Sequence, residues 1–215
     1  MQRLAIIDLD GTLLRRKSSE YSFFLYLILR GKIGPFRLAS FFLTFLLDAV
    51  RLGLRPAIGS NATYLRGKTP EKLAVWAHDY GTAFMREGVP ESLEERIRAL
   101  KAGGCTIILL SGSLQVLVAE LRDKLAADIV IGRELELVGG RLTGRRTGLY
   151  PYARQKVEVL FERVDPAVVD WPGSWALADR LSDLPVLELV GHPVAVHPTA
   201  KLRRYAQQMR WEIID

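Results

Sequence analysis

The sequence predicts an α/β protein built on a doubly wound parallel sheet, with a helical segment inserted after the first strand. The first observation is the short apolar run at residues 4–8, which stops at a polar loop, as a strand buried on both faces does. The second is the alternation of amphipathic helical segments with short apolar runs from residue 91 onward. The third is the stretch of different character between them, residues 15–88. Repeated strand and helix units imply a parallel sheet with helices on both faces and ligands at the carboxyl ends of its strands.

The inserted stretch begins with two apolar runs, residues 21–29 and 38–50, each of helical length. A helix that spans a bilayer needs about 20 apolar residues, so neither run is long enough. A third helix is expected over residues 70–86, because a capping threonine and a proline precede its apolar face. We therefore expect a mostly helical insertion.

After the insertion, an amphipathic helix ends at Gly103-Gly104 and an apolar strand follows. The pattern repeats to the end of the chain, with a hairpin where residues 134–147 alternate around Gly139-Gly140. The predicted helices are 91–102, 114–126, 154–163, 183–189 and 199–210, and the predicted strands are 105–110, 128–131, 174–178 and 194–197. At 215 residues, the chain suits one core domain, residues 1–14 and 89–215, and a cap over the strand ends, residues 15–88.

Positive charge is concentrated near the N-terminus. The net charge is +6, yet residues 1–68 hold eleven Lys and Arg residues against four Asp and Glu residues. Such a segment indicates an anionic partner, which could be a phosphate ester, an acidic lipid surface or nucleic acid. No named nucleic-acid-binding motif accompanies it, so we expect no nucleic-acid partner. A single cysteine, Cys105, and the lack of a signal peptide lead us to expect a cytoplasmic protein.

Two carboxylates, Asp8 and Asp10, directly follow the first strand in the sequence Asp-Leu-Asp-Gly-Thr. Carboxylates beside a core are costly unless a cation or catalysis compensates their charge. This motif resembles the nucleophile motif of the haloacid dehalogenase superfamily, which has a Rossmann-like fold. The resemblance implies that Asp8 is the nucleophile and Asp10 the general acid and base. Dehalogenases of the superfamily lack an acid at the second position, so Asp10 favours phosphate esters over haloalkanoates.

Two further segments resemble the phosphate-binding motifs of that superfamily, in the same order. Ser111 and Gly112 resemble the second motif, in which a hydroxyl and backbone N–H groups bind a phosphoryl oxygen. Lys156 resembles the lysine that neutralises the charges of phosphate and nucleophile, with Arg154 as a competing candidate. The resemblance thus implies a phosphate site at Ser111, Gly112 and Lys156.

The fourth motif of the superfamily supplies acidic metal ligands, and Asp179 and Asp183 keep its spacing. Ala178 and Arg180 stand where the family usually has Gly and Ser, and a long cation at Arg180 either weakens the metal site or contacts a substrate phosphate. The resemblance implies a Mg²⁺ site formed by Asp8, Asp10 through its main-chain carbonyl, Asp179 and Asp183. Magnesium prefers such oxygen ligands.

The end of the chain and the start of the insertion both resemble one subgroup of this superfamily. Residues 191–198, followed by a basic helix, resemble the phosphoserine-phosphatase-like subgroup with helical caps. Residues 18–20 resemble the entry into that cap, which makes Glu20 either a substrate contact or a helix cap. The function implied is hydrolysis of a small phosphate monoester through an aspartyl-phosphate intermediate.

The sequence also bears on several other functions. A P-loop is excluded because Gly67-Lys68-Thr69 lacks the upstream glycine and strand, and the three histidines lack the spacing of zinc ligands. A nearly inactive protein of the same fold, which binds a phosphorylated ligand or a partner, stays open because of Arg180. The aromatic and basic insertion also leaves open a lipid-phosphate phosphatase in peripheral contact with a membrane surface. The oligomeric state is not predicted.

Overall fold

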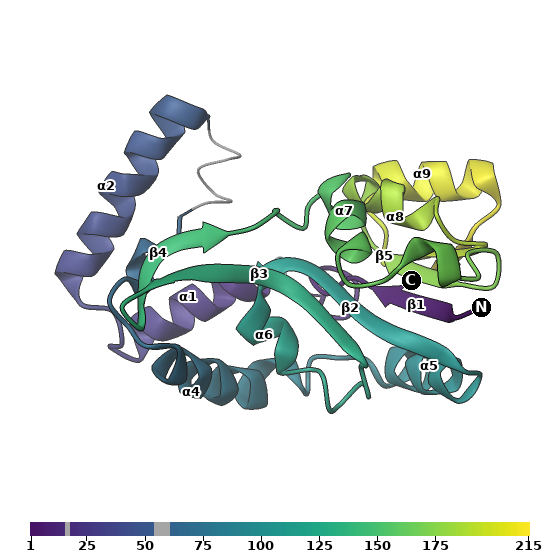
Figure 1. Ribbon diagram of the computed structural model, residues 1–215, viewed down its shortest axis with the longest axis horizontal. Coiled ribbons are helices and arrows are strands. Elements are labelled where there is room, and N and C mark those ends of the chain that lie inside the picture. The colour runs from purple at the N-terminus through teal and green to yellow at the C-terminus, as the bar shows by residue number, and fades with distance from the viewer. Residues whose placement is uncertain (16–17, 54–60) are drawn as a thin grey trace.

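One sheet organises the fold. The computed structural model describes residues 1–15, 18–53 and 61–215, without the Leu52 side chain, and these residues form a seven-stranded sheet (Figure 1). Its strands are β1 (Arg3–Ile7), β2 (Cys105–Leu114), β3 (Ile129–Val138), β4 (Arg141–Thr147), β5 (Trp175–Ala178), β6 (His192–Val196) and β7 (Glu212–Ile214). The spatial order is β4-β3-β2-β1-β5-β6-β7, and only the expected hairpin β3–β4 is antiparallel.

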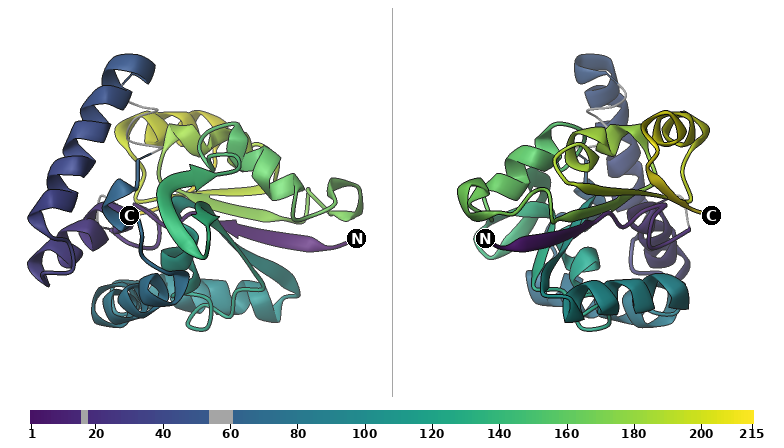
Figure 2. Two further views of the ribbon diagram at one scale, coloured as in Figure 1. Left: turned by 60° about the vertical axis from the view of Figure 1, so that its left-hand side comes forward. Right: turned by 90° about the vertical axis from the view of Figure 1, so that its right-hand side faces the viewer.

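Helices cover both faces of the sheet, because successive side chains of a strand point to opposite sides. In β1, Ala5 and Ile7 pack into one apolar cluster, and Leu4 and Ile6 pack into another. The first cluster is covered by α1 (Ser19–Leu29), α4 (Pro70–Tyr80), α5 (Glu91–Ala102) and α6 (Gln115–Ala119), and the second by α7 (Gln155–Phe161), α8 (Leu184–Leu187) and α9 (Ala200–Met209) (Figure 2). The predicted α/β class with a doubly wound, mostly parallel sheet is confirmed.

Several predicted boundaries were wrong. The strand expected to end at Leu110 continues as β2 to Leu114, with a shift of register against β3 between these two residues. The helix expected over 114–126 is only α6, since residues 120–122 bond three positions back rather than four. The apolar spacing of this segment suits tight turns as well as a helix. The short strand β7 was not predicted, because three residues carry too little periodicity.

The insertion packs onto the carboxyl ends of the strands together with the hairpin β3–β4. It contains α1, α2 (Pro35–Leu52), η1 (Thr63–Leu65), α4 and η2 (Gly81–Met85). The Ala62 N–H donates to the Gly144 carbonyl (2.9 Å), and the Gly67 N–H donates to the Leu142 carbonyl (2.7 Å). The division into cap 15–88 and core stays a prediction, and Arg16, Lys17 and Arg55 of the basic segment lie outside the described residues.

Helix α2 is the element that projects farthest from this body (Figure 1). Its first residue is Pro35 and its last turn contains Arg51. Within the described ranges, no helix combines the length and the apolar character needed to cross a bilayer.

Candidate active site

The register of the three central strands brings the predicted residues to one edge of the sheet. Ile7 of β1 is aligned with Leu109 of β2 and with Leu177 of β5. The next residue, Asp8, donates its N–H to the Leu177 carbonyl at 3.0 Å. Asp8 and Asp179 therefore emerge from adjacent strands at the same level, as expected at the carboxyl ends of a parallel sheet.

Three buried carboxylates form the centre of the site. Oxygen atoms of Asp8, Asp179 and Asp183 lie within 4.8 Å of one another. The Lys156 ammonium, from α7, is 2.5 Å from Asp8 Oδ1 and 2.5 Å from Asp183 Oδ1. Arg154, the competing candidate, is exposed, so Lys156 is the basic residue that the structure places at this cluster.

The acidic charge in this cluster is only partly compensated. Burial raises the pKa of Asp8 to about 7, although Lys156 lowers it, and Asp183 raises it further. Burial also raises the pKa of Asp179 to about 6, against the lowering effect of Arg180. Burial lowers the pKa of Lys156, but Asp8 and Asp183 together hold it above its ordinary value. An additional cation would relieve the remaining repulsion between the carboxylates.

The donor set fits a divalent cation. Asp179 Oδ1 is buried and has no hydrogen-bond partner among the described residues. A carboxylate oxygen of Asp179 lies within 4.8 Å of oxygens of Asp8 and Asp183. Hard cations such as Mg²⁺ prefer carboxylate oxygens of this kind. Asp8, Asp179 and Asp183 are therefore the residues that could hold the ion.

Arg180 lies at the rim of the pocket rather than inside the acidic cluster. Its Nε is 3.1 Å from Asp179 Oδ2, and 51% of its side chain is exposed. Arg180 therefore binds the one Asp179 oxygen and leaves the other available. The departure from the usual motif does not fill the candidate metal site.

Asp10 occupies a separate position, held by donors that sequence reasoning did not assign. Its carboxylate accepts from the Ser19 N–H (2.8 Å) and from the Ser113 hydroxyl (2.5 Å). The Ser19 and Ser113 hydroxyls are also 2.9 Å apart. Two hydrogen bonds to Asp10, and a third that joins the two serines, thus fix the orientation of its carboxylate. This placement of the Asp10 side chain suits the predicted role of general acid and base. The Asp10 carboxylate is not one of the three carboxylates of the acidic cluster.

Ser111 and Gly112 lie beside this network, on the extended end of β2. The Ser111 hydroxyl accepts from the Ser113 N–H at 3.1 Å. A Cβ atom on Gly112 would lie 3.3 Å from the Pro151 carbonyl oxygen and 3.3 Å from the Tyr150 ring. The lack of a side chain at Gly112 therefore keeps this wall of the pocket open.

The acidic cluster opens into a pocket of about 400 Å³ that reaches the insertion. The lower wall contains Asp8, Asp10, Ser111, Lys156 and Asp179. The upper wall is aromatic and charged, and it is formed by Phe24, Phe41, Phe45, Tyr64, Glu20, Arg133, Arg146 and Tyr150 among others. Glu20 is in the pocket, as predicted, but it is ion-paired with Arg133 and Arg146. Those arginines were missed because they are 113 and 126 positions from Glu20 in the sequence.

Gly11 provides a test of the Asp179 position. Its φ is +95°, and a Cβ there would lie 2.1 Å from Asp179 Oδ2. We expect Gly11→Ala to displace Asp179 and to lower the affinity of the acidic cluster for a divalent cation by roughly 10-fold or more, as the loss of a contact that orients a metal ligand does. Calorimetric titration with Mg²⁺ measures this.

The matched control is Gly140→Ala. Gly140 also has a positive φ, +72°, but has nothing within 4 Å of the added Cβ. Both variants bear the backbone cost of about 1–2 kcal/mol for a left-handed alanine, seen as a lower melting temperature. Equal effects of the two variants on Mg²⁺ affinity would contradict the placement of Asp179.

Comparison with known proteins identifies the family. The sequence model of haloacid dehalogenase-like hydrolases matches residues 5–188, and the chain belongs to this family. The predicted membership of the haloacid dehalogenase superfamily, with phosphoserine phosphatases among its relatives, and the prediction of a hydrolytic enzyme are confirmed.

Two curated relatives are phosphatases. The chain is 23% identical to a histidinol-phosphatase of Neisseria meningitidis, over 100% of this chain and 99% of the relative. It is 26% identical to a phosphoserine phosphatase of Archaeoglobus fulgidus, over 72% of this chain but only 43% of that protein. The chain thus spans one of these relatives fully and less than half of the other.

Solved structures share the fold. A protein of unknown function from Bordetella pertussis Tohama I has a TM-score of 0.84 and 25% identity, with 100% of this chain and 99% of that one covered. Apo phosphoserine phosphatase has a TM-score of 0.66 and 17% identity, over 100% of this chain and 94% of that one. At that identity the second likeness concerns the fold alone.

Proposed function

We propose that this chain is a Mg²⁺-dependent phosphatase that hydrolyses a small phosphate monoester through an aspartyl-phosphate intermediate. The observation that carries this proposal is the Lys156 ammonium between Asp8 and Asp183, beside the unpartnered Asp179 oxygen. Two unit charges of the same sign repel each other by about 4 kcal/mol at 4 Å and an effective dielectric of 20, and a phosphate dianion carries two such charges, so a nucleophilic carboxylate needs cations around it. The family and the names of the relatives support the same activity.

In this mechanism Asp8 attacks phosphorus, and its oxygen forms a bond as the ester oxygen leaves. Asp10, oriented by Ser19 and Ser113, gives its proton to the leaving alcohol. Asp10 then takes a proton from a water that attacks phosphorus, which releases phosphate and restores Asp8. Ser111 and Lys156 would contact the phosphoryl oxygens. A Mg²⁺ ion held by Asp8, Asp179, Asp183 and the Asp10 carbonyl would supply further charge compensation.

Hydrolysis of p-nitrophenyl phosphate with Mg²⁺ and with EDTA tests the proposal. We expect turnover that EDTA removes and that added Mg²⁺ restores. Absence of turnover with Mg²⁺, Mn²⁺ or Co²⁺ would instead support the nearly inactive protein that binds a phosphorylated ligand or partner.

Cys105 is a buried free thiol, which is compatible with the reducing cytoplasm that we propose as the compartment.

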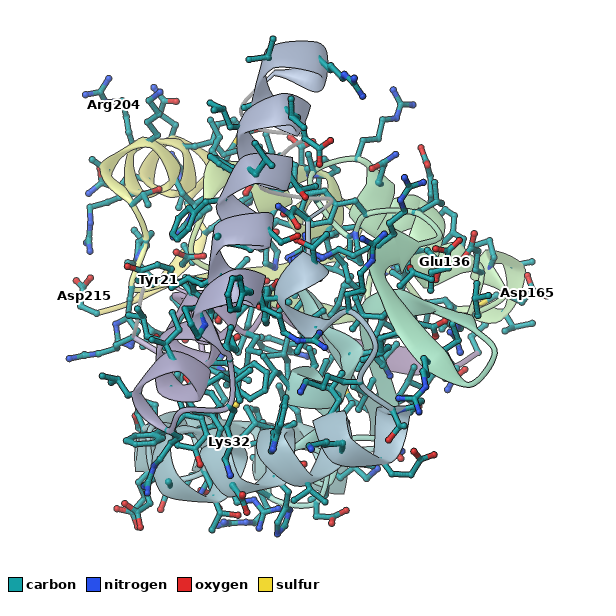
Figure 3. All side chains as sticks on the ribbon, turned by 90° about the vertical axis from the view of Figure 1, so that its left-hand side faces the viewer. Tyr21, Lys32, Glu136, Asp165, Arg204 and Asp215 are labelled. Atoms are coloured by element: carbon teal, nitrogen blue, oxygen red, sulfur yellow. The ribbon has the colours of Figure 1, made fainter. Side chains whose placement is uncertain are left out.

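A second candidate function is supported by the outer face of α2. Phe36, Leu43, Leu46 and Val50 recur on one side of this helix and are 59–91% exposed. Seen from the left-hand side of Figure 1, α2 lies in front of the other described elements (Figure 3). Large exposed apolar surfaces of this kind mark contacts with a partner or a membrane.

Charge favours an anionic lipid surface as the partner of this exposed face of α2. Residues 30–51 include four basic residues, Arg30, Lys32, Arg37 and Arg51, and one acidic residue, Asp48. An amphipathic helix with basic flanks binds at the interface of anionic membranes. The inner side of α2 supplies Phe41 and Phe45 to the pocket. We therefore propose that α2 rests on an acidic bilayer and that the pocket receives a lipid-borne phosphate monoester.

Vesicle flotation tests this second candidate. We expect the protein to float with vesicles of phosphatidylcholine and phosphatidylglycerol, and a Leu43→Glu, Leu46→Glu variant to stay at the bottom, because both side chains are exposed and are not needed by the core. The control is Val138→Glu, Val168→Glu, which changes two exposed apolar residues elsewhere. Equal flotation of all three proteins would refute the bilayer contact. The contact would also be refuted if the wild-type protein did not float and were a dimer that the α2 variant converts to a monomer.

A further inference from the structure

The upper wall of the pocket holds a charged cluster that the reaction described above does not use. Glu20 of α1 is ion-paired with both Arg133 of β3 and Arg146 of β4. The two arginine side chains are each 7% exposed, and the three residues line the same pocket as Asp8. Two guanidiniums share one carboxylate, so the cluster has one more positive than negative charge. Residues 16–17 and 54–60 contain no Asp or Glu that could add to it.

Two tyrosines complete this wall. The Tyr64 hydroxyl is buried and has no hydrogen-bond partner in the described part of the chain. Burial and Glu20 raise the pKa of this tyrosine while Arg146 and Arg133 lower it, which indicates that its hydroxyl is close to the cluster. The Arg133 guanidinium is 4.6 Å from the centre of the Tyr150 ring, which restricts its orientation. A buried hydroxyl without a partner is unfavourable, and a ligand oxygen would satisfy it.

We propose that Glu20, Arg133, Arg146 and Tyr64 form a subsite for a second anionic group, a carboxylate or a second phosphate, on the leaving alcohol of the phosphate monoester. The proposal rests on the phosphatase function proposed above. Guanidiniums bind carboxylate and phosphate through paired hydrogen bonds, and the Tyr64 hydroxyl is a further donor. An amino group on the alcohol is disfavoured, because Glu20 is already shared by two arginines. Glu20 positions these arginines and neutralises only one of them.

The wild-type enzyme tests this selectivity with matched substrates. Glycerol 3-phosphate carries no second charge, 3-phosphoglycerate carries a carboxylate, and phosphoethanolamine carries an ammonium. We expect kcat/KM for 3-phosphoglycerate to exceed the other two by about 10-fold or more, as for a charge-assisted hydrogen bond. Fructose 1,6-bisphosphate compared with fructose 6-phosphate then shows whether a second phosphate is the better anion. Preference for phosphoethanolamine, or no preference for any anion, would overturn the subsite.

A variant tests whether the preference for an anionic leaving group depends on the Glu20, Arg133 and Arg146 cluster. We expect Arg146→Gln to lower the ratio of kcat/KM for 3-phosphoglycerate to that for p-nitrophenyl phosphate by about 10-fold or more. Arg145→Gln is the control, since Arg145 is the exposed neighbour of Arg146 on β4, and its ratio should be that of the wild type. An unchanged ratio in folded Arg146→Gln would mean that the ion pairs only join α1 to the hairpin. If no protein hydrolyses p-nitrophenyl phosphate, the proposed function itself fails.

Discussion

Asp8→Asn is expected to reduce the hydrolysis of p-nitrophenyl phosphate by at least about 10³-fold, as removal of a nucleophile does in other covalent enzymes. The amide keeps the shape of the side chain but cannot form the acyl phosphate. Lys156 keeps its second partner, Asp183, so the surroundings of the site remain held. Steady-state rates in saturating Mg²⁺ measure the effect.

Stability should not fall with the activity of this variant. The pKa of Asp8 is raised to about 7 by burial, so its folded pKa is above the unfolded value. A carboxyl group of this kind lowers stability at every pH above the unfolded pKa, most fully above pH 7. We therefore expect metal-free Asp8→Asn to melt at pH 8 at a temperature equal to or above that of the wild type. A lower melting temperature would point to misfolding as the cause of lost activity.

Two further variants separate the roles of the acids. Asp123→Asn changes an exposed aspartate and should keep the wild-type rate. Asp10→Asn should reduce hydrolysis of alkyl phosphates more than that of p-nitrophenyl phosphate, because nitrophenolate leaves without a proton. Activity of Asp8→Asn above about a tenth of the wild-type rate is far more than a missing nucleophile permits, and would exclude Asp8 from that role.

The lower wall of the site could be predicted from the sequence because parallel strands end at one edge. Asp8, Ser111 and Asp179 each follow an apolar run, and the observed register of β1 with β2 and β5 places those runs side by side. Lys156 could be named only through the family resemblance, because nothing near it in the sequence distinguishes it from Arg154. Burial of Lys156 beside Asp8 and Asp183 is the physical difference between the two.

The upper wall could not be predicted, because its contacts join distant segments. Arg133 and Arg146 lie on the two strands of the hairpin, which looks in the sequence like an exposed turn with scattered charge. Their burial depends on the insertion, whose residues 62–68 pair with β4. No local spacing records that pairing. Among the described residues, the basic side chains that line the pocket are Arg133, Arg146, Lys156 and Arg180, and none of them belongs to the basic N-terminal segment.

Lys156→Met is expected to have the largest combined effect on activity and stability. Lys156 is buried between Asp8 and Asp183, and its removal leaves three carboxylates within 4.8 Å of one another. Loss of one partner from a buried ion pair destabilises a protein by about 3–5 kcal/mol. Loss of a preorganised cation at the phosphoryl group lowers the rate by about 10²–10³-fold. Urea unfolding in EDTA and steady-state kinetics in Mg²⁺ measure the two effects.

The destabilisation should depend on pH in one direction. Without Lys156, the pKa of Asp8 rises above its value of about 7 in the wild type, because the lowering contribution of the ammonium is lost. The folded variant then binds more protons than the unfolded chain over a wide range above pH 4, so its stability increases as pH falls. We expect a larger loss of unfolding free energy at pH 8 than at pH 5.5, with partial recovery at pH 8 on addition of Mg²⁺.

Lys201→Met is the matched control, because Lys201 is an exposed lysine of α9 and should change neither quantity. Lys156→Arg keeps the charge and should recover more stability at pH 8 than Lys156→Met does, although the larger guanidinium does not fit the same space. If Lys156→Met is folded only at pH 5.5 or with Mg²⁺, the same explanation holds, since both conditions compensate the carboxylates. A loss of equal size at both pH values would mean that the lysine contributes through packing of its aliphatic stem rather than through its charge.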